Sequence, residues 1–319
     1  MNIVILGAGA LGSIIGGHLA RAGAEVMVMA RGQRAAFIQQ HGISLTGLAN
    51  FTVPVQVITS PQEIHTADVL IVAVKTADTE AALASVRHVQ VGSALSIQNG
   101  VVKDEQLART FGWDKTLGAA AIISGAVAAN GSVHFTLNDY LALGELPQGT
   151  SARVQTLVDT LVRAGIRAEA SVQIQTVEWS KYALFVSMMA PAALTRLETY
   201  KVYADPDIAC MVARLVHETA RLAAQRRIPL EDRGLLPIKT LCSVSLDEAV
   251  ARIRQVGEAL AARAPTHKIS TLQDLERGRR LEVEETLGYA VQLGTELNIP
   301  LPTMDFCYRL LTGINRFLH

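Results

Sequence analysis

The chain has 319 residues, half of them hydrophobic, which is enough for two domains that each bury a core. Its 29 lysines and arginines balance its 29 aspartates and glutamates, so no overall field favours nucleic acid or an anionic membrane as a partner. The three cysteines, Cys210, Cys242 and Cys307, are widely spaced and fit no disulfide framework or metal-ligand pattern, which predicts buried thiols in a reducing compartment.

The run from Ile3 to Ala20 carries no full charge, so a secretory signal or a membrane anchor is one interpretation. Only Met1 and Asn2 precede it, whereas a signal peptide begins with a basic segment. Its glycines interrupt it and Arg21 ends it, which disfavours a membrane span. We therefore expect a cytoplasmic protein without membrane contact.

Short apolar runs alternate with helical segments over the first part of the chain. The predicted strands are residues 2–6, 25–30, 43–45, 52–57, 68–74 and 94–98. The predicted helices are residues 13–22, 33–40 and 79–86. This alternation predicts a parallel, right-handed βαβ sheet of the Rossmann type.

The pattern changes after residue 117. Strands at residues 118–127 and 132–143 flank Asn130-Gly131, which predicts a hairpin, and a helix at 151–164 and a strand at 168–172 follow. Helix formers dominate from Gln175, with long helices predicted at 205–226, 281–297 and 304–317. The sequence thus predicts an α/β domain, residues 1–172, followed by an all-helical domain, residues 173–319. An exposed apolar stripe on helix 205–226 would support a homodimer, whereas burial would make that stripe part of the core.

The sequence GAGALG at residues 7–12 fits G-x-G-x-x-G and lies where the first predicted strand meets the first helix. In such turns the first glycine permits the tight turn, the second admits a pyrophosphate, and the third lets helix and strand pack closely. Gly7, Gly9, Ala10, Leu11 and Gly12 are therefore the predicted cofactor-binding residues of the turn. The alternative is a turn that serves packing alone.

After the second predicted strand, at Arg31-Gly32-Gln33-Arg34, the acidic residue usual for an NAD site is absent. Two guanidinium groups suit the 2′-phosphate of NADP(H), because arginine binds phosphate bidentately. The alternative is two solvated charges at the start of a helix. We predict NADP(H), with Arg31 as a cofactor-binding residue.

Lys75 and Asn99 directly follow two of the predicted strands. Ligands of open α/β sheets bind beyond the carboxyl ends of the strands, so both residues are predicted to face the same cleft as the glycine turn. A solvated strand end and a plain Asn-Gly turn are the alternatives.

Several segments together resemble the ketopantoate reductase family, in the family's order and spacing over nearly the whole chain. They are GAGALG, Arg31, Val74-Lys75-Thr76, Gln98-Asn99-Gly100, Glu178-Trp179-Ser180-Lys181 and STLQD at residues 270–274, followed by Glu282. The resemblance implies NADPH-dependent reduction of a 2-oxo acid to a 2-hydroxy acid, between a Rossmann domain and a helical domain, in pantothenate biosynthesis.

The resemblance also implies roles for single residues. Lys181 matches the catalytic lysine that protonates the substrate oxygen, and Glu282 matches the glutamate that binds the substrate hydroxyl and the lysine. Asn99 and Lys75 match residues beside the nicotinamide and substrate, and Ser270 matches a substrate-contacting serine. An ammonium suits this chemistry, because hydride addition leaves charge on the carbonyl oxygen. Taken alone, Lys181 and Glu282 would be ordinary surface charges.

The chain departs from the family on the helix after the lysine. Where the family has asparagines, this sequence has Phe185, Met189 and Thr199. Residues four apart share a helix face, so we expect an apolar wall beside Lys181. Such a wall leaves the hydroxyl groups of a polyhydroxy substrate unpaired and favours a more apolar 2-oxo acid.

The predicted function is NADPH-dependent reduction of 2-dehydropantoate to pantoate, or of a related and more apolar 2-oxo acid. Imine reduction, hydroxy-acid oxidation, and NADP(H) binding without turnover are the alternatives on the same scaffold. The predicted partners are NADP(H) and the small-molecule acid, with no metal.

Overall fold

The structure, a computed structural model, describes residues 1–318 and forms two compact units. Unit 1 comprises Met1–Gln98 and Lys103–Gln175. Unit 2 comprises Asn99–Val102 and the chain from Thr176 onward. The chain therefore passes from one unit to the other three times, and a short segment in the middle of the sequence belongs to unit 2.

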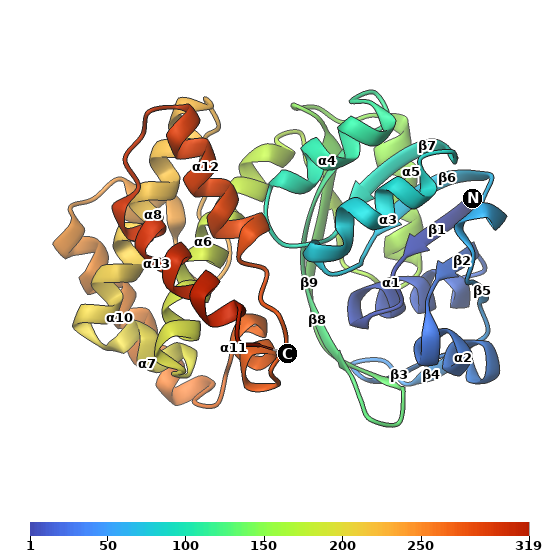
Figure 1. Ribbon diagram of the computed structural model, residues 1–319, viewed down its shortest axis with the longest axis horizontal. Helices are drawn as coiled ribbons and strands as arrows, with labels where there is room; N and C mark the ends of the chain where they lie inside the picture. The colour runs from blue at the N-terminus through green and yellow to red at the C-terminus, as the bar shows by residue number, and fades with distance from the viewer. Residues whose placement is uncertain (319) are drawn as a thin grey trace. The chain divides into compact units, whose positions relative to one another are not determined.

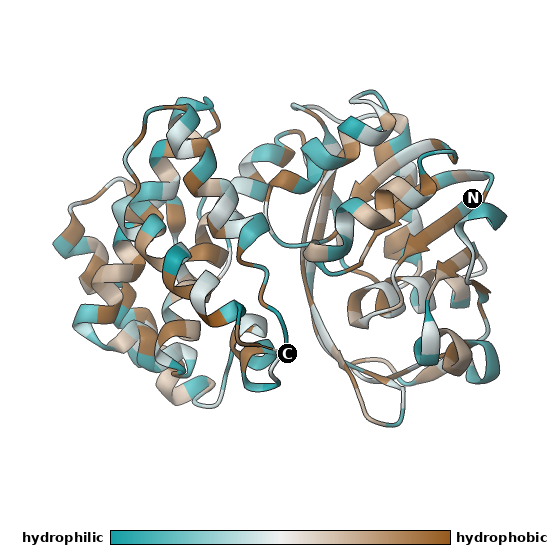
Figure 2. Ribbon diagram, in the orientation of Figure 1, coloured by the Kyte–Doolittle hydropathy of each residue, from teal (hydrophilic) through white to brown (hydrophobic). Residues whose placement is uncertain are grey.

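Unit 1 contains a five-stranded parallel sheet with the order β5-β2-β1-β6-β7 (Figure 1). Its strands are β1 (Asn2–Leu6), β2 (Glu25–Met29), β5 (Gln56–Ile58), β6 (Thr66–Val72) and β7 (Gln90–Ser96). This order is that of a doubly wound dinucleotide-binding sheet, so the predicted Rossmann-type architecture is confirmed. Strand β1 is hydrophobic along most of its length (Figure 2), as expected for a strand covered on both faces.

A second sheet of unit 1 has the order β10-β9-β3-β4, with β8 paired to β9. Its strands are β3 (Ile43–Gly47), β4 (Phe51–Val53), β8 (Leu117–Val127), β9 (Val133–Glu145) and β10 (Ala168–Ala170). The antiparallel pair β8 and β9 confirms the predicted hairpin. The single strand predicted at 52–57 is wrong, because Pro54 offers no N–H to a ladder and the run divides into β4 and β5, which join different sheets.

Helix α1 (Ala10–Arg21) contacts strands of both sheets. All of its residues from Gly12 to Leu19 are buried. An added Cβ at Gly16 would lie 2.9 Å from Ile5 Cδ1, and one at Gly17 would lie 2.9 Å from Ile43 Cγ2. These two glycines therefore let the helix approach both sheets closely.

The other helical segments of unit 1 connect its strands. They are α2 (Gly32–His41), η1 (Pro61–Glu63), η2 (Thr76–Asp78), α3 (Thr79–Val86), α4 (Val102–Phe111) and α5 (Ala152–Arg163). Helix α4 was not predicted from the sequence, although it begins just after Asn99-Gly100.

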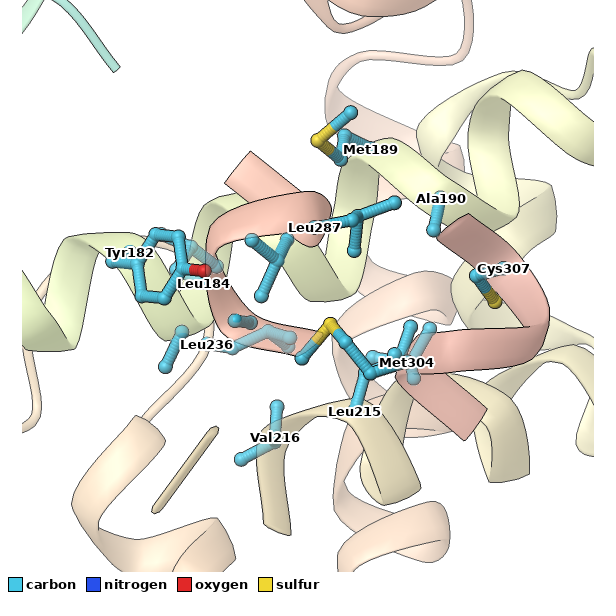
Figure 3. Packing of buried hydrophobic residues seen from close by; sticks show 14 of the residues in the cluster. Tyr182, Leu184, Met189, Ala190, Leu215, Val216, Leu236, Leu287, Met304 and Cys307 are labelled. Carbon is cyan, nitrogen blue, oxygen red and sulfur yellow. The ribbon is translucent and has the colours of Figure 1, made fainter. Parts of the chain in front are cut away.

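Unit 2 is helical in the part that the structure describes. Its helices are α6 (Ile174–Thr195), α7 (Thr199–Ala204), α8 (Pro206–Gln225), α9 (Ile238–Cys242), α10 (Leu246–Arg263), α11 (Ser270–Glu276), α12 (Tyr289–Glu296) and α13 (Pro302–Asn315). The predicted helix 281–297 is replaced by a π-helical turn, η3 (Glu284–Gly288), followed by α12. Figure 3 shows part of the apolar core of unit 2. The apolar residues of α8 are buried in this core, so of the two interpretations of its stripe the structure shows burial in the core.

The three cysteines form no disulfide, but only Cys307 is fully buried, whereas Cys210 and Cys242 are half-buried. Burial raises the pKa of both the Cys242 and the Cys307 thiol to about 11, so they stay protonated at neutral pH. No helix within residues 1–318 is long and apolar enough to cross a membrane.

Candidate active site

The glycine turn joins β1 to α1 and has the backbone geometry that its glycines allow. Gly7 has a φ of 107°, which favours glycine, and an added Cβ there would lie 2.8 Å from the backbone nitrogen of Val74. An added Cβ at Gly12 would lie 2.0 Å from the carbonyl oxygen of Gly7. The first and third glycines are thus required by the packing of the turn itself.

Gly9 is the N-cap of α1 and borders open space, since an added Cβ would meet no atom within 4 Å. No side chain among residues 1–318 caps this helix, and its first turn contains no acidic residue. The first N–H groups of a helix have no partner inside the helix and bind anions readily. The residues Gly9, Ala10 and Leu11 therefore fit the pyrophosphate of a dinucleotide.

The two arginines after β2 differ in their surroundings. Arg31 is the N-cap of α2 and its side chain is exposed. Arg34 is half-buried, and its guanidinium donates to the carbonyl oxygen of Ala8 and to Ser13 Oγ, both at 2.8 Å. Three of the five N–H groups of Arg34 are thus bonded to protein atoms, whereas the exposed Arg31 is the more accessible of the two predicted guanidinium groups.

Lys75 lies in the loop between β6 and η2, with an exposed side chain. The loop is held by Gln98, whose Nε2 donates to the carbonyl oxygen of Val74 at 2.8 Å and to Thr79 Oγ1 at 2.7 Å. Gln98 is 7 % exposed, so it is a structural partner of this loop that the sequence pattern did not identify. The sequence feature that could have identified Gln98 is its position directly before Asn99 in the Gln98-Asn99-Gly100 motif.

The structure brings together three of the predicted site residues within unit 2. Lys181 lies on α6, Asn99 lies in the segment after β7, and Glu282 lies just before η3. Lys181 Nζ donates to Asn99 Oδ1 at 3.4 Å, and Asn99 Nδ2 donates to Glu282 Oε2 at 3.0 Å. Asn99 thus links the ammonium to the carboxylate, with its amide oxygen toward the cation and its amide nitrogen toward the anion.

The π-helical turn η3 begins two residues after Glu282 and is tied to the helix that carries Lys181. Gly288 N donates to the carbonyl oxygen of Val283 at 2.9 Å, five residues back, and Thr286 Oγ1 donates to the carbonyl oxygen of Glu282. Tyr182 OH donates to the carbonyl oxygen of Thr286 at 2.8 Å. Single π turns occur frequently at functional sites, and here the turn fixes the backbone of the candidate glutamate.

Asn315 on α13 holds the other side of Glu282. Its Oδ1 accepts from Leu281 N at 2.8 Å, and its Nδ2 donates to the carbonyl oxygen of Leu281 at 3.0 Å. The residue before Glu282 is therefore bonded at both of its backbone polar groups. Nothing in the local sequence around Asn315 indicates this role.

The residues at the departures from the family lie in different places. Met189 is fully buried among the side chains in Figure 3, and its Sδ lies 3.4 Å from Thr286 Oγ1. The expectation that Met189 lines an open apolar wall is therefore wrong. Phe185 is half-buried and packs against the same core, so it keeps some exposed apolar surface.

Ser270 is the first residue of α11 and is exposed, outside the hydrogen-bonded group of Lys181, Asn99 and Glu282. The segment before it is anchored by Thr199, because Thr199 Oγ1 lies 2.9 Å from His267 Nδ1 and Thr199 N donates to the carbonyl oxygen of His267. Thr199 thus fixes the position of the segment that precedes Ser270.

A separate hollow of about 700 Å³ on unit 2 is lined by α8, the end of α9 and the starts of α10 and α13. Glu218 in its wall accepts from Thr303 N and Met304 N and so caps α13, which is a structural role. None of the predicted site residues lines it. Among residues 1–318 no group of three or more His, Cys, Asp or Glu is placed to hold a metal ion.

Comparison with known proteins gives matches along nearly the whole chain. Residues 3–148 match the family model described as "Ketopantoate reductase PanE/ApbA", and residues 173–315 match "Ketopantoate reductase PanE/ApbA C terminal". The chain is 30% identical over 313 residues to 2-dehydropantoate 2-reductase of Archaeoglobus fulgidus, covering 98% of this chain and 97% of that protein.

Solved structures share the fold. A PanE/ApbA family ketopantoate reductase from Ralstonia eutropha JMP134 superposes with a TM-score of 0.84 at 26% identity, covering 99% of both chains. D-mandelate dehydrogenase with NADH and anilino(oxo)acetate superposes with a TM-score of 0.83 at 20% identity, covering 100% of this chain and 99% of that one. The second likeness concerns the fold alone.

Proposed function

The chain belongs to the ketopantoate reductase family of oxidoreductases, and from this premise we propose that it reduces a 2-oxo acid to a 2-hydroxy acid with NADPH as reductant. We assign cofactor binding to residues 1–172. We assign substrate binding and catalysis to residues 173–319, together with Asn99. Relatives named 2-dehydropantoate 2-reductase make 2-dehydropantoate the first substrate to test.

The observation that carries this proposal is the hydrogen-bonded group of Lys181, Asn99 and Glu282. A carbonyl reductase needs one group that protonates the oxygen and others that hold the donor and the substrate in line. Lys181 is the only one of the three with an ammonium to donate. Asn99 orients that ammonium through its amide oxygen, and Glu282 accepts a hydrogen bond from the amide nitrogen of Asn99.

Cofactor binding is assigned to the open turn at Gly9, Ala10 and Leu11, with the exposed Arg31 on the 2′-phosphate. Lys75, in the loop held by Gln98, is assigned to the same site. When bound, the reduced nicotinamide supplies the hydride.

Lys181 Nζ transfers its proton to the oxygen as the carbonyl carbon gains the hydride, so the 2-oxo acid becomes the 2-hydroxy acid. Asn99 Oδ1 accepts from the nitrogen of Lys181 in both its charged and its neutral form, which keeps the amine in place while it regains a proton from solvent. Glu282, a carboxylate, accepts from the new hydroxyl. Ser270 is assigned to the substrate carboxylate.

The side chain of the substrate is proposed to be more apolar than that of ketopantoate. The support for this step is Phe185, which replaces a polar residue of the family and keeps exposed apolar surface. Met189 does not support it, because it is fully buried. Since D-mandelate dehydrogenase shares this fold and was solved with NADH and anilino(oxo)acetate, aromatic 2-oxo acids and NADH are also worth testing.

The test is NADPH oxidation by the purified chain with 2-dehydropantoate, unbranched aliphatic 2-oxo acids and aromatic 2-oxo acids. Lys181→Met is expected to lower kcat by about a hundredfold or more. Lys239→Met, on α9, removes an exposed lysine of the same unit and is expected to leave the rate unchanged. A Lys181→Met enzyme with the wild-type rate would refute the assignment of the proton donor.

A further inference from the structure

Arg34 is a half-buried cation whose hydrogen-bond partners are all neutral. Its Nε donates to the carbonyl oxygen of Ala8 at 2.8 Å, its Nη1 to that of Gly131 at 2.5 Å, and its Nη2 to Ser13 Oγ at 2.8 Å. No carboxylate pairs with it in the part of the chain that the structure describes. A buried charge normally has an ionic partner, so this guanidinium departs from the usual pattern.

The neutral partners belong to the glycine turn itself. Ala8 is the second residue of GAGALG, and Ser13 lies in the first two turns of α1. Ser13 Oγ also donates to the carbonyl oxygen of Ala8 at 3.1 Å. The guanidinium of Arg34 is therefore attached directly to the backbone that would hold a pyrophosphate.

The position of Arg34 is fixed by the β8–β9 hairpin and by its own helix. Gly131 accepts a hydrogen bond from it, and the ring centroid of Phe37, one turn further along α2, lies 5.7 Å from its guanidinium carbon. An added Cβ at Gly131 would lie 2.5 Å from the Phe37 ring. The side chain thus has little freedom to move to an anion at some other place.

The charge of Arg34 remains uncompensated by the protein. Burial lowers the pKa of Arg34, yet an arginine stays protonated at any physiological pH. A guanidinium has five N–H groups, and three of them are bonded to protein atoms. The others have no acceptor among residues 1–318, and the first turn of α1 has no acidic residue to neutralise the charge.

We propose that Arg34 provides the positive charge opposite the pyrophosphate of the bound dinucleotide, and that it contributes equally to the binding of NADPH and NADH. Arg31 then distinguishes the two cofactors, because it alone is assigned to the 2′-phosphate. The two arginines, three residues apart, have separate functions. This inference rests on the proposed function, since it requires the turn to bind a dinucleotide.

The experiment measures the dissociation constants of NADPH and NADH by calorimetry for the wild type, Arg34→Met, Arg34→Lys and Arg31→Met, each at low and at high salt. Arg34→Met is expected to weaken both cofactors about tenfold or more, with the ratio of their affinities unchanged. Arg31→Met is expected to weaken NADPH alone. Arg163→Met, an exposed arginine of unit 1, serves as the control for the loss of one positive charge.

Salt dependence separates the charge from the structural effect of losing three hydrogen bonds. Affinity is expected to fall less with added salt in Arg34→Met than in the wild type, and Arg34→Lys is expected to retain the wild-type salt dependence. Melting temperatures establish that each variant is folded.

The inference would be overturned if Arg34→Met bound both cofactors as the wild type does, or if it weakened NADPH alone. An unchanged salt dependence in Arg34→Met would also overturn it. Failure of the proposed function looks different, because the wild type itself would then bind neither nucleotide, or would bind them without reducing any 2-oxo acid.

Discussion

Replacing Asn99 with alanine tests the central arrangement of the candidate site. The variant keeps the side chains of Lys181 and Glu282 and removes only the amide that links them. Asn99 lies in a loop and not inside a helix or strand, so the loss of its side chain is expected to change the fold little. We expect a lower kcat and an unchanged KM for NADPH.

The magnitude follows from the two hydrogen bonds. A hydrogen bond to a charged group contributes about 1.5–3 kcal/mol. The bond to Lys181 is long, at 3.4 Å, and the bond to Glu282 is 3.0 Å, in a half-buried place. A combined effect of about 2 kcal/mol on the transition state is therefore reasonable, which corresponds to a roughly 30-fold lower kcat.

The assay is steady-state NADPH oxidation at saturating 2-oxo acid, with the melting temperature measured in parallel. Asn50→Ala is a matched control, because it removes an exposed amide of unit 1 that donates to the carbonyl oxygen of Gly47. An Asn99→Ala enzyme with the kcat of the wild type, or with a loss confined to the KM for NADPH, would refute the reasoning.

Three further predictions concern single contacts. Tyr182→Phe leaves the buried carbonyl oxygen of Thr286 without its donor and should lower the free energy of unfolding by about 1–2 kcal/mol, measured by urea denaturation; an unchanged midpoint would show that the bond is not needed. Gly9→Ala should keep the wild-type melting temperature, because its Cβ meets no atom within 4 Å, and should bind NADPH about tenfold more weakly; undiminished binding would place the pyrophosphate elsewhere. Hydrogen bonds from Arg153 lower the pKa of Glu145, so their stabilisation is present above about pH 4.5 and is lost as the pH falls through the lower folded-state pKa. Glu145→Gln should therefore melt below the wild type at neutral pH, and the difference should shrink in acid; a gap that stays constant would contradict this sign.

The sequence predicted the features that depend on local pattern. The parallel sheet and the glycine turn follow from apolar runs of strand length and from glycines at the end of β1. Asn99 and Lys75 follow the predicted strands, but not directly, because β7 ends at Ser96 and β6 at Val72, three residues before each of them. The pairing of Asn99 with Glu282, 183 positions away, needs the folded chain.

The remaining errors have a physical cause in tertiary contacts. Spacing along a helix places Phe185 and Met189 on one face, but only packing decides that Met189 is fully buried while Phe185 is not. In the same way, the sequence alone does not distinguish Arg34 from Arg31, because both are charged residues at the start of a helix. Its partners, Ala8 and Gly131, come from two distant parts of the sequence.

The membership of Asn99–Val102 in unit 2 has a consequence for recombination between related genes. In a hybrid made by a crossover near residue 175, Lys181 and Glu282 would come from one parent and Asn99 from the other. The hybrid would then join hydrogen-bonded residues of the candidate site that had diverged separately. Functional chimaeras of this family should therefore require that the loop at residues 99–102 be transferred together with the C-terminal half.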